Sequence, residues 1–180
     1  YVDGMKNPER DVVLRHLLVS AQMLSSGETV CNCLVHPSAR QAAHQSFADS
    51  ISKELAWCLD NITGDFATEL KKLYAFLNPT KSEKKSFSEI LAYAQKIVKG
   101  NESKIIVMNG KTDVDSDEYS SGCNFIVGGN TLGRGVTFPR LQTIYYTRSA
   151  KKPQADTMWQ HSRMFGYDRD PGMMMVFIDE

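Results

Sequence analysis

Four short and almost uninterrupted apolar runs in the second half of the chain constrain its fold more than any other feature. They span residues 104–108, 124–127, 141–146 and 173–178, and Gly, Asn or charged residues bound each run. Strands covered on both faces, as in a parallel sheet, have near-continuous hydrophobicity of this kind. A fifth strand is predicted at 29–35, where short and partly β-branched residues lead into His36-Pro37.

Helical periodicity fills most of the remaining chain. Apolar residues recur at helical spacing over 8–26, which predicts an amphipathic helix that stops at Ser25-Ser26-Gly27. Further helices are predicted at 38–59, 68–77, 86–98 and 154–165. Strands that alternate with helices predict an α/β fold with an open, mostly parallel sheet. Because the 38–100 region is too long for a simple crossover, we expect one crossover helix and a helical insertion at 60–100.

Length and composition fit one soluble domain that spans residues 1–180. Because 21 Lys and Arg balance 21 Asp and Glu, the chain lacks the excess charge with which proteins coat nucleic acid non-specifically. No apolar run approaches the ~20 residues of a membrane-spanning helix, and the first residues do not form a signal peptide. We therefore expect a cytoplasmic protein without a membrane partner. Since the chain begins without Met and stops after an apolar run, we expect a piece of a longer polypeptide.

The four cysteines contain no CxxC pair and are too few for a disulfide scaffold. We expect reduced and mostly buried thiols, with Cys31 and Cys33 on one face of their strand. Together with His36 and His44 they could suggest zinc, but alternating cysteines on a strand do not converge with a histidine two turns into a helix. No metal site is therefore predicted.

Gly110-Lys111-Thr112 follows a predicted strand and has the ending of a phosphate-binding loop. The pattern needs a Gly five positions before Gly110, where this chain has Ile105 inside the strand. A helix should follow, whereas the chain continues with the acidic residues 113–118, which would repel phosphate. We interpret this segment as a turn and expect no phosphate loop in this chain.

Two later segments carry residues suited to phosphate chemistry. The first, 127–139, contains four glycines in eight residues around Arg134, and exposed backbone N–H groups beside an arginine suit phosphate binding. A flexible loop with a solvated arginine is the alternative. The second, 159–169, brings Gln160, Arg163 and Arg169 to a helix end, where arginine could stabilise a transferring phosphoryl group. Its alternative is a set of surface arginines paired with Asp168 and Asp170.

Together these segments resemble the nucleic-acid-dependent motors of helicase superfamily two. Residues 128–139 align without gaps on motif V through Arg134, Gly135 and Pro139, and residues 160–169 resemble motif VI, the helix that carries the arginine finger. The chain is closer still to the Z1 domain family, helicase-like ATPases of prokaryotic restriction and defence systems. Members of that family have a similar Gly-Gly-Asn-Thr-Leu-x-Arg-Gly segment, a Gln-x-x-Arg-x-Phe-Gly-Tyr helix and a strand ending Leu-Val-His, here Leu34-Val35-His36.

The resemblance implies the second, C-terminal RecA-like lobe of a DNA translocase. It implies that ATP and Mg²⁺ are held mainly by a first RecA-like lobe of the same polypeptide, and that a nuclease subunit or domain is coupled to the motor. It also implies three sets of site residues: catalytic Arg163, Arg169 and Gln160; nucleotide-binding Gly133, Arg134, Gly135 and Thr137; and nucleic-acid-binding His36, Ser38, Gly129, Asn130 and Thr131.

Two positions depart from the helicase pattern. Thr137 stands where helicases commonly carry Asp, as is usual in the Z1 family, and this weakens the expected ribose contact. The motif VI arginines of helicases lie three apart, whereas Arg163 and Arg169 lie six apart, and we favour Arg163 as the finger.

Two other interpretations remain open. The chain could be a non-catalytic RecA-like module that binds protein or nucleic acid, with the helical insertion recruiting the partner. Within that insertion, Lys81, Lys84 and Lys85 form a basic patch near Phe87 that could contact DNA or could be a solvated loop.

Overall fold

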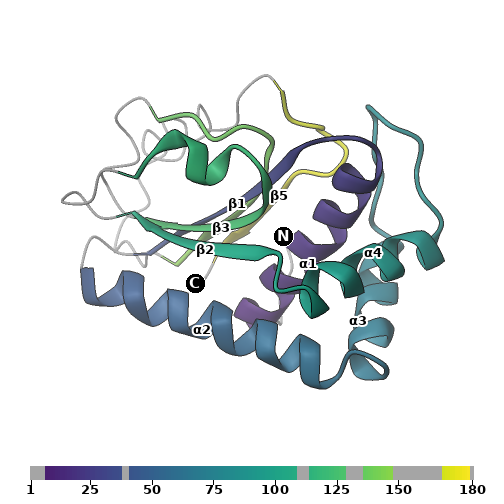
Figure 1. Ribbon diagram of the computed structural model, residues 1–180, viewed down its shortest axis with the longest axis horizontal. Coiled ribbons are helices and arrows are strands. Elements are labelled where there is room, and N and C mark those ends of the chain that lie inside the picture. The colour runs from purple at the N-terminus through teal and green to yellow at the C-terminus, as the bar shows by residue number, and fades with distance from the viewer. Residues whose placement is uncertain (1–6, 38–40, 109–113, 129–135, 148–167, 179–180) are drawn as a thin grey trace.

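A five-stranded, entirely parallel sheet with the order β2-β3-β1-β4-β5 organises the chain (Figure 1). The computed structural model describes residues 7–37, 41–108, 114–128, 136–147 and 168–178. The strands are β1 (Val30–His36), β2 (Ser103–Met108), β3 (Gly122–Gly128), β4 (Leu141–Tyr146) and β5 (Met175–Ile178). This is an open α/β fold of the RecA-like kind, as the sequence predicts.

Strand register divides the central side chains between two faces. Cys31 pairs with Cys123 and Val35 with Val127, so alternate residues of β1 and β3 point to the same face. That face packs against the helices in the larger hydrophobic core, which contains Cys33 and Phe125. The opposite face carries the smaller core, and includes Leu34, Ile106, Ile126 and Ile144.

Four helices lie on the side of the first face: α1 (Pro8–Ser25) and α2 (Gln41–Asp60), which contact the strands, and α3 (Asp65–Tyr74) and α4 (Phe87–Lys99). Side-chain caps stabilise the first turns of two of these helices. The Asn7 side chain caps α1 by accepting from the Arg10 N–H at 3.1 Å, and Pro8 takes the first helical position. Ser86 and Glu89 form a capping box at the start of α4.

Helix α1 lies between the sheet and helices α3 and α4, in contact with both layers (Figure 1). Every residue from Val12 to Met23 is buried, including Arg15, His16, Ser20 and Gln22. The prediction of an amphipathic helix is therefore wrong. In the sequence, the polar residues of this helix have the spacing of a face exposed to solvent. In the structure, neighbouring elements cover that face as well.

On the second face, the described residues contribute the short 3-10 helix η1 (Ser116–Tyr119) and residues 136–140. The rings of Tyr119 and Phe138 meet edge to face at 5.1 Å over the apolar strand residues. Below them, the Asn124 amide donates to Asn32 Oδ1 at 3.0 Å. Asn32 in turn donates to the carbonyls of Tyr119 and Pro139, which ties both loops to the sheet.

Most predicted elements are confirmed with small shifts. Helix α3 begins three residues earlier than predicted, because Gly64 and Asp65 start it, and residues up to Leu77 continue only as turns. Strand β5 begins at Met175, since Met173 belongs to a turn in which its N–H donates to the Asp170 carbonyl. Helices α3 and α4 occupy the predicted insertion at 60–100. The predicted helix at 154–165 lies outside the described residues.

The cysteines are free and buried, as predicted. Burial raises the pKa of Cys58 and of Cys123 to about 12, so these thiols stay protonated at neutral pH. Among the described residues, no group of three or more His, Cys, Asp or Glu side chains could hold a metal ion. No described helix has the length and hydropathy of a membrane-spanning segment.

The buried His16 gives the fold a pH dependence. Its ring meets Phe125 edge to face at 4.6 Å, and burial lowers its pKa from 6.5 to about 3, with only a partial offset from the Asn124 backbone. The folded protein therefore keeps His16 neutral at pH values where the unfolded chain binds a proton. The free energy of unfolding therefore has its full value above pH 6.5 as far as His16 is concerned, and it decreases progressively as the pH falls toward 3.

We predict that replacing His16 with Leu removes this dependence. Between pH 7 and pH 5 the wild type should lose about 2 kcal/mol more unfolding free energy than His16→Leu, because each pKa unit corresponds to ~1.4 kcal/mol. Urea denaturation at the two pH values measures the difference. Equal losses in both proteins would contradict the burial of a neutral imidazole.

Candidate functional site at the carboxyl edge of the sheet

The carboxyl ends of three neighbouring strands meet at one edge of the sheet. In the order β3-β1-β4 these strands end at Gly128, His36 and Tyr146. The register places Val35 beside Val127 on one side, and His36 beside Tyr146 on the other. Any segments that follow these strands therefore start side by side.

The connections on the two sides of this point leave in opposite directions. After β1 the chain enters α2, which packs on the helical face, whereas after β3 it reaches Phe138, which packs on the other face. A position where neighbouring connections diverge is where open α/β sheets form their ligand crevice. The geometry therefore selects the β1–β3 junction as the candidate site.

His36 is buried at this junction, with its ring 5.5 Å from that of Tyr146. Burial raises the pKa of the Tyr146 phenol to about 12, so it stays protonated and neutral at physiological pH. The last described residues of the three strands thus offer an imidazole, a phenol and a glycine backbone. These groups suit positioning and hydrogen bonding more than proton abstraction.

Most of the predicted site residues lie on the connections that follow these strands, outside the described residues. They are Ser38, after β1; Gly129, Asn130, Thr131, Gly133, Arg134 and Gly135, after β3; and Gln160 and Arg163, after β4. The rejected phosphate loop, with Lys111, lies outside them too, while Ile105 stands inside β2 as predicted.

Two predicted site residues are described but lie away from the junction. Thr137 is exposed beside the buried Phe138, on the segment that returns to the start of β4. Arg169 lies between Asp168 and Asp170, which contact Arg140 and Gln142 at the start of β4. The structure therefore brings His36 to the carboxyl edge but places Arg169 at the opposite, amino edge.

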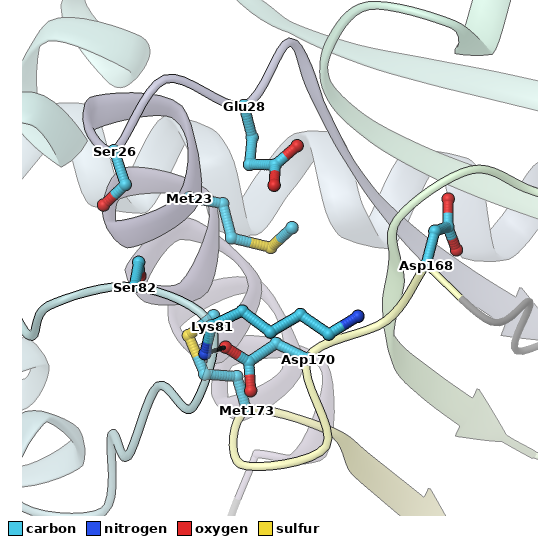
Figure 2. A pocket seen from close by; sticks show the side chains of 8 residues that line it. All are labelled: Met23, Ser26, Glu28, Lys81, Ser82, Asp168, Asp170 and Met173. Carbon is cyan, nitrogen blue, oxygen red and sulfur yellow. Dashed lines mark hydrogen bonds between the residues drawn. The ribbon is translucent and has the colours of Figure 1, made fainter.

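That amino edge contains a small polar cavity (Figure 2). Lys81 extends across it toward Asp168, and Asp170 lies beneath (Figure 2). Glu28 and Asp168 approach from two sides, and both contact Arg140, at 2.8 Å and 3.6 Å. The remaining lining residues are Met23, Ser26, Ser82 and Met173.

Asp170 is the structural centre of this edge. Its carboxylate accepts hydrogen bonds from the Thr80 hydroxyl at 2.6 Å and from the backbone N–H groups of Thr80, Lys81 and Gly172. Its own backbone N–H and carbonyl pair with the Gln142 amide, each at 2.9 Å. Burial raises the pKa of Asp170, but these hydrogen bonds outweigh it and lower the pKa below 3.8.

Close packing reinforces the contact between the turn at Asp170 and the α3–α4 connection. A Cβ atom at Gly172 would lie 1.9 Å from the Asn78 carbonyl oxygen, so only glycine fits. The sequence gives only a weak signal for this contact. It contains an Asp-x-Gly turn and a Pro-Thr turn, but nothing in their residues predicts that two turns about ninety residues apart lie in contact. Sequence reasoning missed Asp170 and treated it only as a possible partner of arginine.

Comparison with known proteins gives one match. The Z1 domain family matches residues 12–173, which include every described strand except β5. No curated protein and no solved structure matches the chain.

We predict that Asp170→Asn destabilises the fold by about 2–3 kcal/mol at pH 7, because charge-assisted hydrogen bonds contribute ~1.5–3 kcal/mol each and the amide retains only part of them. The deficit should shrink below pH 4, since the stability from a lowered carboxyl pKa is lost as the pH falls through it. Urea denaturation measures both effects, with the exposed Asp60→Asn as the matched control. Equal stability of the two variants would contradict this role.

Proposed function

Because the chain belongs to the Z1 domain family, we propose that it is the second RecA-like lobe of a nucleic-acid-dependent ATPase, a DNA translocase of a restriction or defence system. One observation carries this proposal. The segments that resemble motif V and motif VI follow β3 and β4, and these strands flank β1, which ends at His36. The topology thus supports a common starting edge for the connections that contain these two segments and for the connection after β1.

The proposed chemistry needs positioning and positive charge more than a base. Phosphoryl transfer is accelerated by groups that stabilise the charge spread over the transferred phosphoryl oxygens. In this proposal Arg163 is the arginine finger and Gln160 orients it, while the backbone of Gly133 and Gly135 and the guanidinium of Arg134 approach the phosphates. The amino-edge position of Arg169 favours Arg163 for the finger.

ATP and Mg²⁺ would be held mainly by a first lobe of the same polypeptide. The described strands end at His36, Met108, Gly128, Tyr146 and Ile178. None of these residues carries a carboxylate, the ligand that Mg²⁺ prefers beside substrate phosphates. When bound, the ion would neutralise phosphate charge, and this lobe would add arginine and backbone N–H groups from the other side.

The nucleic-acid contact belongs to the same edge. In this proposal His36 and Ser38 after β1, with Gly129, Asn130 and Thr131 after β3, contact the DNA backbone through imidazole, hydroxyl, amide and backbone groups. Contacts to phosphate and sugar position a protein on DNA without reading its sequence, which suits a translocase. A coupled nuclease and a cytoplasmic location complete the proposal.

We predict that Arg163→Ala lowers DNA-stimulated ATP turnover by ~10³–10⁵-fold in a polypeptide that contains both lobes, the range associated with arginine fingers. Arg134→Ala should also abolish the stimulated turnover. Steady-state phosphate release with and without DNA measures both effects.

Lys111→Ala is the matched control and should leave ATP affinity unchanged, since Ile105 breaks the phosphate-loop pattern. Loss of ATP affinity in that variant would instead assign this chain a phosphate loop of its own. If both arginine variants hydrolyse ATP at the wild-type rate, the proposal of a motor lobe is wrong and the non-catalytic binding module is favoured.

A further inference from the structure

Strand β2 lies at the edge of the sheet, with an apolar sequence like that of the buried strands but without their burial. Among the described strands its one neighbour is β3, and the register from Ser103 to Met108 contains no bulge. All seven residues of the central strand β1 are buried, whereas Ile106 alone is buried among the six residues of β2. The apolar residues of β2 therefore exceed what the described part of the chain covers.

The backbone of β2 also has a free side. An edge strand presents unpaired N–H and C=O groups there, on alternate residues, and these groups form a template for another strand. Proteins usually protect such an edge with proline, a bulge, a very short strand or charged side chains. Of these devices β2 has only Lys104, which shares the second face of the sheet with Ile106. The chemistry of this edge therefore selects an extended segment as its occupant.

A groove of about 400 Å³ lies beside the first residues of β2, where this strand contacts helix α2 (Figure 1). This volume falls in the range of ~300–1,000 Å³ that is common for ligand pockets. The apolar lining comes from α2, the end of α4 and β2, and consists of Leu55, Ala56, Leu59, Val98 and Ile105. Leu59 is 48% exposed. Because side chains alternate along a strand, every second residue of a segment paired with β2 would point toward α2, and one such side chain fits this groove.

The charges around the groove are positive in sum. Lys99 is the one charged residue of its lining, and Lys104 is exposed on β2. Glu102 is the acid between these lysines, and its carboxylate lies back over the turn that precedes β2. On α2 the exposed Lys53 and Asp60, which adjoin lining residues in sequence, offset each other. An acidic residue next to the apolar ones therefore complements this rim.

We propose that β2 and this groove form a docking surface for an extended segment of a partner protein, which adds a further strand to the sheet. The segment has apolar residues at alternate positions, one of which enters the groove, and an acidic residue that pairs with Lys99. Backbone hydrogen bonds supply affinity in this mode of recognition, and the side-chain groove supplies specificity. The docking surface contains none of the motif residues, so the inference is independent of the proposed function.

The test uses a fluorescein-labelled octapeptide, Asp-Thr-Leu-Thr-Leu-Thr-Leu-Asp, whose alternating leucines and terminal acids meet these requirements. Its fluorescence anisotropy should rise saturably as the 180-residue chain is added. Ala56→Trp should weaken binding about tenfold or more, because the indole fills the groove that an apolar anchor needs. Ala92→Trp is the matched control, at an exposed alanine of α4 outside the lining, and should leave binding within about twofold. Absence of saturable binding, or equal losses in both variants, would overturn the proposal.

Lys99→Glu tests the charge at the rim. It should weaken octapeptide binding several-fold at low salt and less at high salt, because salt screens the repulsion between exposed carboxylates. Lys53→Glu makes the same charge change on α2, outside the lining, and should weaken binding less. Equal effects of the two variants would overturn the pairing with Lys99.

Backbone methylation of the peptide tests strand addition directly. Two versions of the octapeptide carry N-methyl groups at alternate residues, one at even and one at odd positions. A methyl group removes a backbone donor and blocks pairing on that side of the peptide, so one version should lose binding and the other should retain it. Loss in both versions, or retention in both, would overturn pairing with the edge of β2.

Hydrogen exchange locates the peptide on the sheet. On binding, the backbone amides of alternate β2 residues should exchange more slowly, since they face solvent in the free chain and are paired in the complex. Equal protection of β5, the other edge of the described sheet, would show non-specific strand pairing. Protection of β2 without peptide, together with a dimer in sedimentation, would identify a second copy of the chain as the occupant. Either result would overturn the proposal.

Discussion

The burial of helix α1 on all sides is the constraint on which the rest of the structure depends. A helix between a sheet and a second helical layer must bury its polar side chains, and here two of them, Arg15 and Gln22, bind the backbone of loops. Arg15, whose pKa burial lowers to about 10, stays charged and binds the backbone carbonyls of Phe76 and Met173. Gln22 binds the α3–α4 connection. Polar residues in the central helix thereby fix loops that have no regular structure.

The candidate site, by contrast, arises from topology. Placing β1 between β3 and β4 makes three connections start at one edge, and the connections after β1 and β3 go to opposite faces, the arrangement in which open α/β sheets bind ligands. In the proposed function the side chains at this edge would need no special pKa, because phosphoryl transfer depends mainly on placed charge. The arginine and glycine segments would supply that charge and the backbone N–H groups, while the fold would supply only their common edge.

Sequence patterns predicted the elements of the sheet because each depends on a few neighbouring residues. Ile106, Ile126 and Ile144 are buried on the second face, and the apolar runs that contain them predict this burial directly. The contacts of Asp170 could not be predicted, since they join residues about ninety positions apart. The contacts of Gln22 could not be predicted for a similar reason. A polar residue on a helix has the same sequence pattern whether it faces solvent or a loop of the same chain. The motif residues are proposed from sequence because each motif is contiguous, and they stay a prediction.

At the amino edge, the turn before β5 is linked mechanically to the α3–α4 connection. The turn at Asp170 follows the arginine-rich segment in sequence, and its carboxylate binds the backbone of Thr80 and Lys81, on the α3–α4 connection. Gly172 packs so closely on Asn78 that the turn cannot slide against this connection without breaking the contact. Arg15 adds a third link by binding the carbonyls of Phe76 and Met173. A displacement of the turn before β5 must therefore move the α3–α4 connection with it or break these hydrogen bonds, because close-packed cores switch between discrete arrangements instead of deforming gradually.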